Sequence, residues 1–131
     1  GLTGSGKWVG GVLAGNGKIY GIPFTSTSVL IIDPTTNAAS TTTIAELPGG
    51  SGNWHDGVLA RNGKIYGIPH NSASVLIIDT TTDTADITTI TGLAGGGKWV
   101  GGALANNGKI YGIPHHSESV LIVKRKCDWG L

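Results

Sequence analysis

Methionine is absent from the 131 residues of this chain, phenylalanine and cysteine occur once each, and only 13% of the residues are charged. The longest apolar runs are four residues, as at 29–32, so the sequence predicts no membrane span. The single cysteine, Cys127, cannot form a disulfide within the chain. A net charge of +1 is too small to indicate a nucleic-acid or membrane-surface partner, and we expect neither.

Glycine contributes 23 residues, and threonine and serine are also abundant. This composition is typical of short strands joined by tight turns and unsuited to long helices. The length fits one globular domain. We therefore expect an all-β fold in a single domain over residues 1–131.

An internal repeat organises the chain. The segment NGKIYGIP begins at Asn16, Asn62 and Asn107, and SVLI begins 12 residues after each, so the spacing is 46 residues and then 45. Residues 6–32 and 97–123 share 21 of 27 positions. Copies this alike should fold alike, and we place three units at about 6–47, 52–93 and 97–131.

Four strands are expected in each unit. The first two, around WVGGVLA and KIYGIP, flank Asn16-Gly17, which predicts a hairpin with a type I′ turn. Proline closes the second strand because it cannot donate to a continuing ladder. The third strand is SVLIID, and we expect the fourth in the threonine-rich segments STTTI and DITTI.

The third strand is apolar on both sides, because Val29 and Ile31 alternate with Leu30 and Ile32. A small sheet covered on both faces by similar sheets describes a β-propeller blade. The segments Trp8-Val9-Gly10-Gly11, NGKIYGIP and SVLIIDPTTN resemble the blade repeats of kelch, YVTN and quinoprotein-like propellers. The resemblance implies four-stranded antiparallel blades, with the first strand lining a central channel and the fourth at the outer edge.

Three blades are fewer than the roughly four to eight that close a propeller, so each end of the arc would expose an apolar face. We expect a homodimer with three blades per chain and six in the ring; the alternative is a fragment of a longer single-chain propeller. The last blade has a truncated or divergent outer strand. There, KRKCDW either forms an abbreviated strand, with Cys127 as a peripheral thiol, or frays.

The linkers between units and the loops after each proline should share one end of the channel. This places every histidine of the chain together, with the three repeated tryptophans, and predicts a ligand-binding face. Its candidate residues are Trp8, Trp54, Trp99, His55, Asp56, His70, His115 and His116.

Each candidate also has a structural interpretation. One tryptophan per unit favours packing between blades over a platform for sugars. No histidine pair has zinc-motif spacing, and His115 and His116 should point apart if extended, so we expect no metal and no cofactor. His55 and Asp56 replace the Val-Gly of the other units and could act as an acid–base pair, but no serine or cysteine nucleophile is marked beside them.

These patterns favour a non-enzymatic, self-associating propeller that serves as a structural or binding scaffold. The alternative is a lectin-like module with one shallow carbohydrate site per blade. We expect the partners of the chain to be a second copy of itself and a glycan or another small ligand. An enzyme is the third hypothesis.

Overall fold

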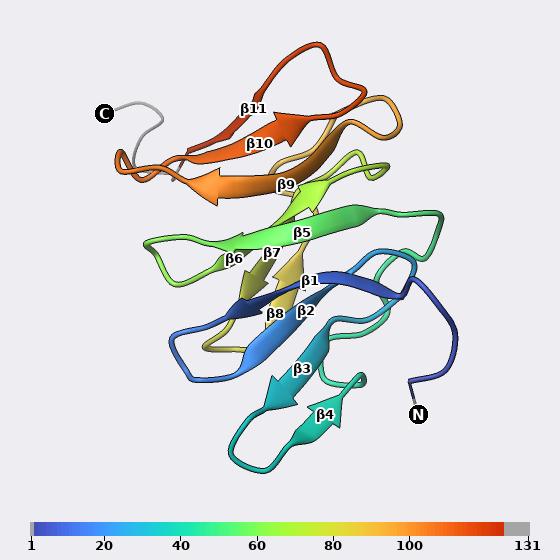
Figure 1. The fold of residues 1–131 in the computed structure, drawn as a ribbon, viewed down its shortest axis with the longest axis vertical. Coiled ribbons are helices and arrows are strands. Elements are labelled where there is room, and N and C mark those ends of the chain that lie inside the picture. The colour runs from blue at the N-terminus through green and yellow to red at the C-terminus, as the bar shows by residue number, and fades with distance from the viewer. Residues whose placement is uncertain (1, 125–131) are drawn as a thin grey trace.

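The computed structural model describes residues 2–124, which form three antiparallel sheets stacked one after another (Figure 1). The first sheet contains β1 (Trp8–Leu13), β2 (Ile19–Pro23), β3 (Leu30–Asp33) and β4 (Ala38–Ser40). The second contains β5 (Trp54–Leu59), β6 (Ile65–Pro69), β7 (Leu76–Asp79) and β8 (Thr84–Asp86). The third contains β9 (Trp99–Leu104), β10 (Ile110–Pro114) and β11 (Leu121–Val123). We find no helix among residues 2–124 that could span a membrane.

The sheets are propeller blades, as the repeat predicted. In the two four-stranded sheets the spatial order follows the chain, and the innermost strands β1, β5 and β9 lie next to one another (Figure 1). The linkers and the loops after each proline meet at one end, where the His70 amide donates to the Asn53 carbonyl and the Lys98 amide donates to the His70 carbonyl, both at 2.9 Å. The loops that carry the candidate residues therefore share one face of the arc, which we call the histidine face.

The fourth strand differs from the prediction. β4 and β8 end at the first residue of each threonine-rich segment, because Asp33 and Asp79 each accept bonds from the threonine two residues later and close a tight turn. Asn37 and Asp83 end these turns with φ of 59° and 53°, so the outer strand begins directly after them. The threonine-rich segments form bends instead. A corresponding strand of the third blade, with KRKCDW and Cys127, lies outside the described residues.

The hairpin turn also differs from the type I′ prediction. Gly17 has φ of 84°, whereas Asn16 does not have positive φ. The Ala14 amide donates to the Lys18 carbonyl at 2.9 Å and the Gly17 amide donates to the Ala14 carbonyl at 3.0 Å, which brackets a three-residue loop. Such loops need only one left-handed residue, and glycine supplies it here.

Two apolar cores lie between the sheets. We call the face of a blade toward the preceding blade its leading face, and the opposite face its trailing face. The middle blade is covered on both: Leu76 and Ile78 belong to the first core, and Val75 and Ile77 belong to the second. This confirms the two-sided burial predicted from the alternating apolar residues of the third strand.

Candidate functional site

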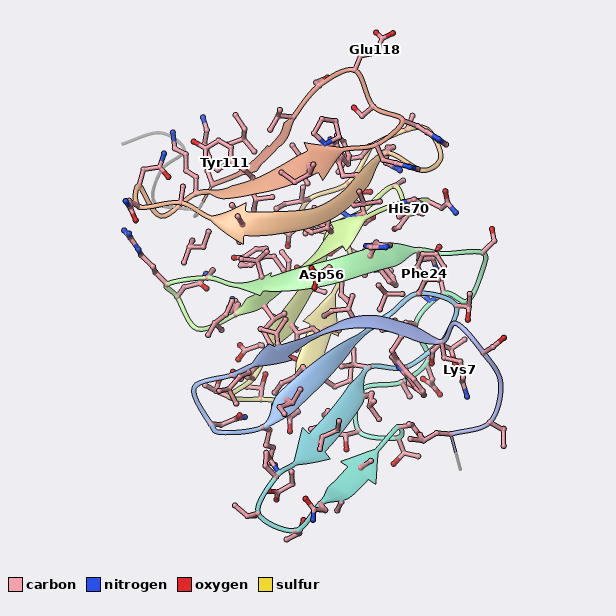
Figure 2. The ribbon with its side chains drawn as sticks, in the orientation of Figure 1. Lys7, Phe24, Asp56, His70, Tyr111 and Glu118 are labelled. Atoms are coloured by element: carbon pink, nitrogen blue, oxygen red, sulfur yellow. The ribbon has the colours of Figure 1, made fainter. Side chains whose placement is uncertain are left out.

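Five aromatic rings form a continuous row along the histidine face. Each neighbour lies within contact range: Phe24 to His55, His55 to His70, and Phe24 to His70 are each 5.8 Å between ring centroids. His70 to His115 is 5.9 Å, and His115 to His116 is 4.4 Å. In Figure 2 the labelled Phe24 and His70 lie at the same end of the strands. We call these five residues the histidine row.

Two local features build this row. Phe24, His70 and His115 each follow the proline that ends the second strand of a blade, so the repeat sets them side by side. His55 comes from the innermost strand β5 and contacts both Phe24 and His70, so these three rings form a triangle at one end of the row. His115 and His116 were expected to point apart if extended, but both lie after the end of β10 and are not in an extended strand. Their rings stack at 19°.

His70 is the most constrained histidine of the row. Its Nδ1 lies 3.3 Å from the Trp99 carbonyl oxygen, and because that oxygen can only accept, Nδ1 carries the proton and Nε2 has the free lone pair. Burial lowers the pKa of His70 below its ordinary value, and the neighbouring histidines add to this effect, whereas the Trp99 carbonyl opposes it. The Trp99 contact thus orients the His70 ring, and burial favours its neutral form.

His55 has an unsatisfied atom. Its Nδ1 is buried, and among the side-chain atoms of residues 2–124 it is the one buried nitrogen or oxygen without a hydrogen-bond partner. Leaving a buried polar atom unpaired costs about 1–3 kcal/mol. The valines at the corresponding positions of the other blades, Val9 and Val100, have no polar atom to satisfy.

Asp56 has a strained backbone. Its φ is 68° at a position where the other blades have glycine, Gly10 at 83° and Gly101 at 69°. A left-handed conformation costs a non-glycine residue about 1–2 kcal/mol. The Asp56 carboxylate lies against the preceding blade, since a Cβ added to Gly10 would fall 2.2 Å from its Oδ1. Figure 2 places Asp56 midway along β5, on the innermost strands.

The tryptophans pack between blades. Trp54 is fully buried and Trp99 is 7% exposed. Each indole Nε1 donates to a serine carbonyl two residues before the third strand of its own blade, at 2.7–2.8 Å. Rings in this position offer no face for stacking a sugar. Trp8 makes the same bond to the Ser28 carbonyl but is only half-buried, and the Lys7 ammonium lies 5.0 Å from its ring centre.

The structure separates the predicted site residues into two groups. His55, His70, His115 and His116 come together in the histidine row, and Asp56 is the residue next to His55 in β5, whereas Trp54 and Trp99 lie in the cores. Within the described part of the chain, no three histidine, cysteine or acidic side chains are grouped so that they could hold a metal ion.

Sequence reasoning missed Lys98, which is only 4% exposed. Its ammonium donates to the carbonyls of His70 at 3.2 Å, Ser72 at 2.8 Å and Gly95 at 2.7 Å, and burial lowers its pKa. The signal for it was the residue before the repeated tryptophan, which is Lys7, Asn53 and Lys98 in the three blades. Lys98 fastens the third blade to the loop that carries His70.

The His70 environment predicts a pH-dependent stability. Because its pKa is lowered on folding, the unfolded chain takes up the proton first as the pH falls through about 6.5, so stability present above that pH is lost below it. Replacing His70 by Phe, the residue at the matching position of the first blade, should flatten the free energy of unfolding between about pH 7 and pH 5. Urea unfolding at several pH values measures this, and equal slopes in both proteins would contradict it.

Comparisons with known proteins match the fold only. No protein family and no curated protein matches the chain. The structure resembles virginiamycin B lyase from Staphylococcus aureus in its selenomethionine form, with 15% identity and a TM-score of 0.66, covering 95% of this chain and 44% of that one. A catalytically inactive histidine-to-alanine variant of virginiamycin B lyase from the same organism, with quinupristin, has 11% identity, a TM-score of 0.61 and the same coverages. A streptogramin B lyase has 12% identity and a TM-score of 0.64, covering 95% and 43%.

These neighbours correct the functional expectation. A non-enzymatic scaffold, with a lectin-like module as its alternative, was the prediction, and it is wrong, because the propellers that the chain resembles are lyases. The chain spans less than half the length of these lyases. At this level of identity the likeness establishes the architecture: the chain is a set of β-propeller blades.

Proposed function

We propose that this chain forms part of a propeller enzyme that removes a proton from a small ligand bound at the histidine row, with His70 as the general base. The single observation that carries the proposal is the 3.3 Å contact between His70 Nδ1 and the Trp99 carbonyl oxygen. The Nδ1–H points at that carbonyl, so Nε2 can accept a proton. The lowered pKa favours the neutral form that a base requires at pH 7.

Two departures from ideal geometry lie in β5, whose His55 ring is 5.8 Å from the His70 ring. Asp56 keeps a left-handed backbone where its counterparts are glycine, and His55 keeps a buried nitrogen unpaired. Strain of this kind gathers at functional sites, where binding or chemistry compensates for it. Both departures occur in the blade that carries His70 and in neither of the other two. In our proposal His55 and Asp56 orient the ligand.

The reaction class is elimination, which the names of the structural neighbours support. His70 Nε2 takes a proton from a carbon of the ligand, the electron pair of the broken C–H bond becomes a double bond, and the leaving group departs with the electrons of its own bond. One neighbour is inactive after a histidine is replaced by alanine, so a histidine matters for catalysis in that protein.

Quinupristin, the compound named with that neighbour, is the probe for the test. We expect the native chain to convert it, as followed by liquid chromatography with mass detection. His70→Phe should lower the rate by about 100-fold or more, as for loss of a general base. Lys109→Ala, on the turn at the opposite end of the strands, is the control and should leave the rate unchanged.

Asp56→Gly supplies an independent readout in the same experiment. It should raise the free energy of unfolding by about 1 kcal/mol, because the strain is relieved, while it weakens binding of the probe. A proton-abstraction site at the histidine row would be refuted by full activity in His70→Phe. It would equally be refuted if the native chain neither bound nor converted quinupristin.

A further inference from the structure

Within residues 2–124, nothing covers the trailing face of the third blade, at one end of the arc. Ile113, Val120 and Ile122 are 52%, 50% and 49% exposed. Their counterparts in the middle blade, 45 residues earlier, are only 0–8% exposed because the third blade covers them: Ile68, Val75 and Ile77. The exposed residues are the same three residue types in the same strands, so the face is built for a covering blade.

None of the described residues covers the leading face of the first blade either, at the other end of the arc. Four apolar residues of the first blade are half-buried there: Trp8, Ile19, Leu30 and Ile32. Their counterparts in the middle blade have no exposed surface, because the first blade covers them: Trp54, Ile65, Leu76 and Ile78. In Figure 1 the two open faces lie at opposite ends of the stack.

The two open faces match each other in composition. The second core joins Val58, Tyr66, Ile68, Val75 and Ile77 to Trp99, Ile110, Leu121 and Val123. At the equivalent positions the open faces supply Ala103, Tyr111, Ile113, Val120 and Ile122 on one side, and Trp8, Ile19, Leu30 and Ile32 on the other. Seven of these nine pairs are identical, and the remaining two exchange one aliphatic residue for another. A contact between the open faces would therefore repeat a packing that this chain already makes.

The lysine before the repeated tryptophan is a further point of similarity between the open faces and the interface of the second and third blades. At the interface between the second and third blades, Lys98 donates to the carbonyls of His70 and Ser72 of the second blade. At the open leading face the equivalent lysine is Lys7, and at the open trailing face the equivalent carbonyls belong to His115 and Ser117. At the interface between the first and second blades this position is Asn53, whose side-chain amide donates to the Pro48 carbonyl at 2.7 Å. The open faces thus have both halves of the buried lysine contact.

The open faces also have the two residues needed for a tyrosine hydrogen bond between blades. Across the first interface the Tyr20 hydroxyl donates to Asp83 Oδ1 at 2.7 Å. On the open faces Tyr111 takes the place of Tyr20, and Asn37 takes the place of Asp83 with nearly the same backbone, φ 59° against 53°. The side-chain oxygen of Asn37 can accept the same bond.

We infer that the partner of these faces is a second copy of the chain, with the trailing face of the third blade of each copy packed on the leading face of the first blade of the other. The contact is head to tail and occurs twice, so two chains close a six-bladed ring about a two-fold axis. Six lies within the usual range for propellers, whereas three chains would give nine blades. Lys7 of each copy binds the His115 and Ser117 carbonyls of the other. This inference stands whether or not His70 is a catalytic base.

Sedimentation equilibrium at micromolar concentration tests the ring. We expect twice the 13.3 kDa mass of one chain. Val120→Glu on the trailing face and Ile32→Glu on the leading face should each give a monomer with an unchanged circular dichroism spectrum, because a carboxylate would be buried without a partner. Thr42→Glu makes the same charge change at an exposed position outside both faces, and should remain a dimer.

A mixing experiment distinguishes this arrangement from pairing of like faces. Val120→Glu keeps an intact leading face and Ile32→Glu keeps an intact trailing face, so an equimolar mixture should recover a heterodimer held by one good interface. Lys7→Met, which leaves the apolar faces intact, should weaken the native dimer by about tenfold or more. A native chain that stays monomeric, a mass other than two chains, or a dimer of Ile32→Glu alone would overturn the inference.

Discussion

Replacing Trp54 by Ala should lower the free energy of unfolding by about 3–5 kcal/mol, the usual cost of deleting a fully buried large aromatic side chain. Trp54 has no exposed surface, and its indole nitrogen donates to the Ser74 carbonyl at 2.8 Å. The substitution would open a cavity between the first two blades and leave that carbonyl without its partner. Urea unfolding followed by circular dichroism measures the effect.

Trp8→Ala is the matched control for this experiment. It removes the same ring and the same hydrogen bond, at 2.8 Å to the Ser28 carbonyl, from a site that is only half-buried among the residues that the structure describes. At a concentration where sedimentation shows monomer, we expect a cost of only about 1–2 kcal/mol. If the two variants were equally destabilised under those conditions, cover by the neighbouring blade would not be the source of the Trp54 effect.

Gly10→Ala should cost about 3 kcal/mol, from left-handed backbone strain and from overpacking together. Gly10 has φ of 83°, and a Cβ there would lie 2.2 Å from Asp56 Oδ1 and 2.9 Å from the Asp56 Cα. The side chain could turn away from the new methyl group, but the Cα belongs to the backbone of β5 and could not. The innermost strands of the first two blades would have to separate.

Gly101→Ala separates the two contributions. Its φ is similar, 69°, but the nearest atom to an added Cβ is Asp56 Oδ2 at 3.7 Å, which is ordinary contact. We expect a loss of only about 1–2 kcal/mol there, the backbone cost alone. The double variant with Asp56→Gly provides a second check: it should recover part of the Gly10→Ala loss and little of the Gly101→Ala loss. Equal losses in the two alanine variants would show that contact with Asp56 contributes nothing.

Much of the architecture could be predicted from the sequence because the repeat tests each assignment three times. The blade, its strand order and the grouping of the histidines follow from periodicity and from proline and glycine positions. The outer strand was misplaced because threonine favours strands in general. Here the hydrogen bonds that Asp33 and Asp79 accept from threonine close the turn early and draw Ala38 and Thr84 into the ladder.

The site was harder to predict than the fold. Nothing in the sequence shows that Trp99 contributes a carbonyl to His70, or that His55 Nδ1 is left without a partner, because these depend on how two blades meet. The sequence shows the exchange of Val-Gly for His55-Asp56, but it does not show the loss of folding free energy that the exchange brings. Only the backbone angle of Asp56 reveals that the substitution entered a position suited to glycine.

The contact between Asp56 and Gly10 also imposes an order on the units. The Asp56 carboxylate occupies the space that any side chain at Gly10 would need, whereas Gly101 on the other side is farther away. An aspartate-bearing blade therefore has to follow a glycine-bearing one, and two copies of the middle blade cannot be neighbours without rebuilding their inner strands. Duplication or shuffling of these nearly identical repeats would therefore be limited by sterics, because the middle blade fits only after a blade with glycine at this position, such as the first or the third.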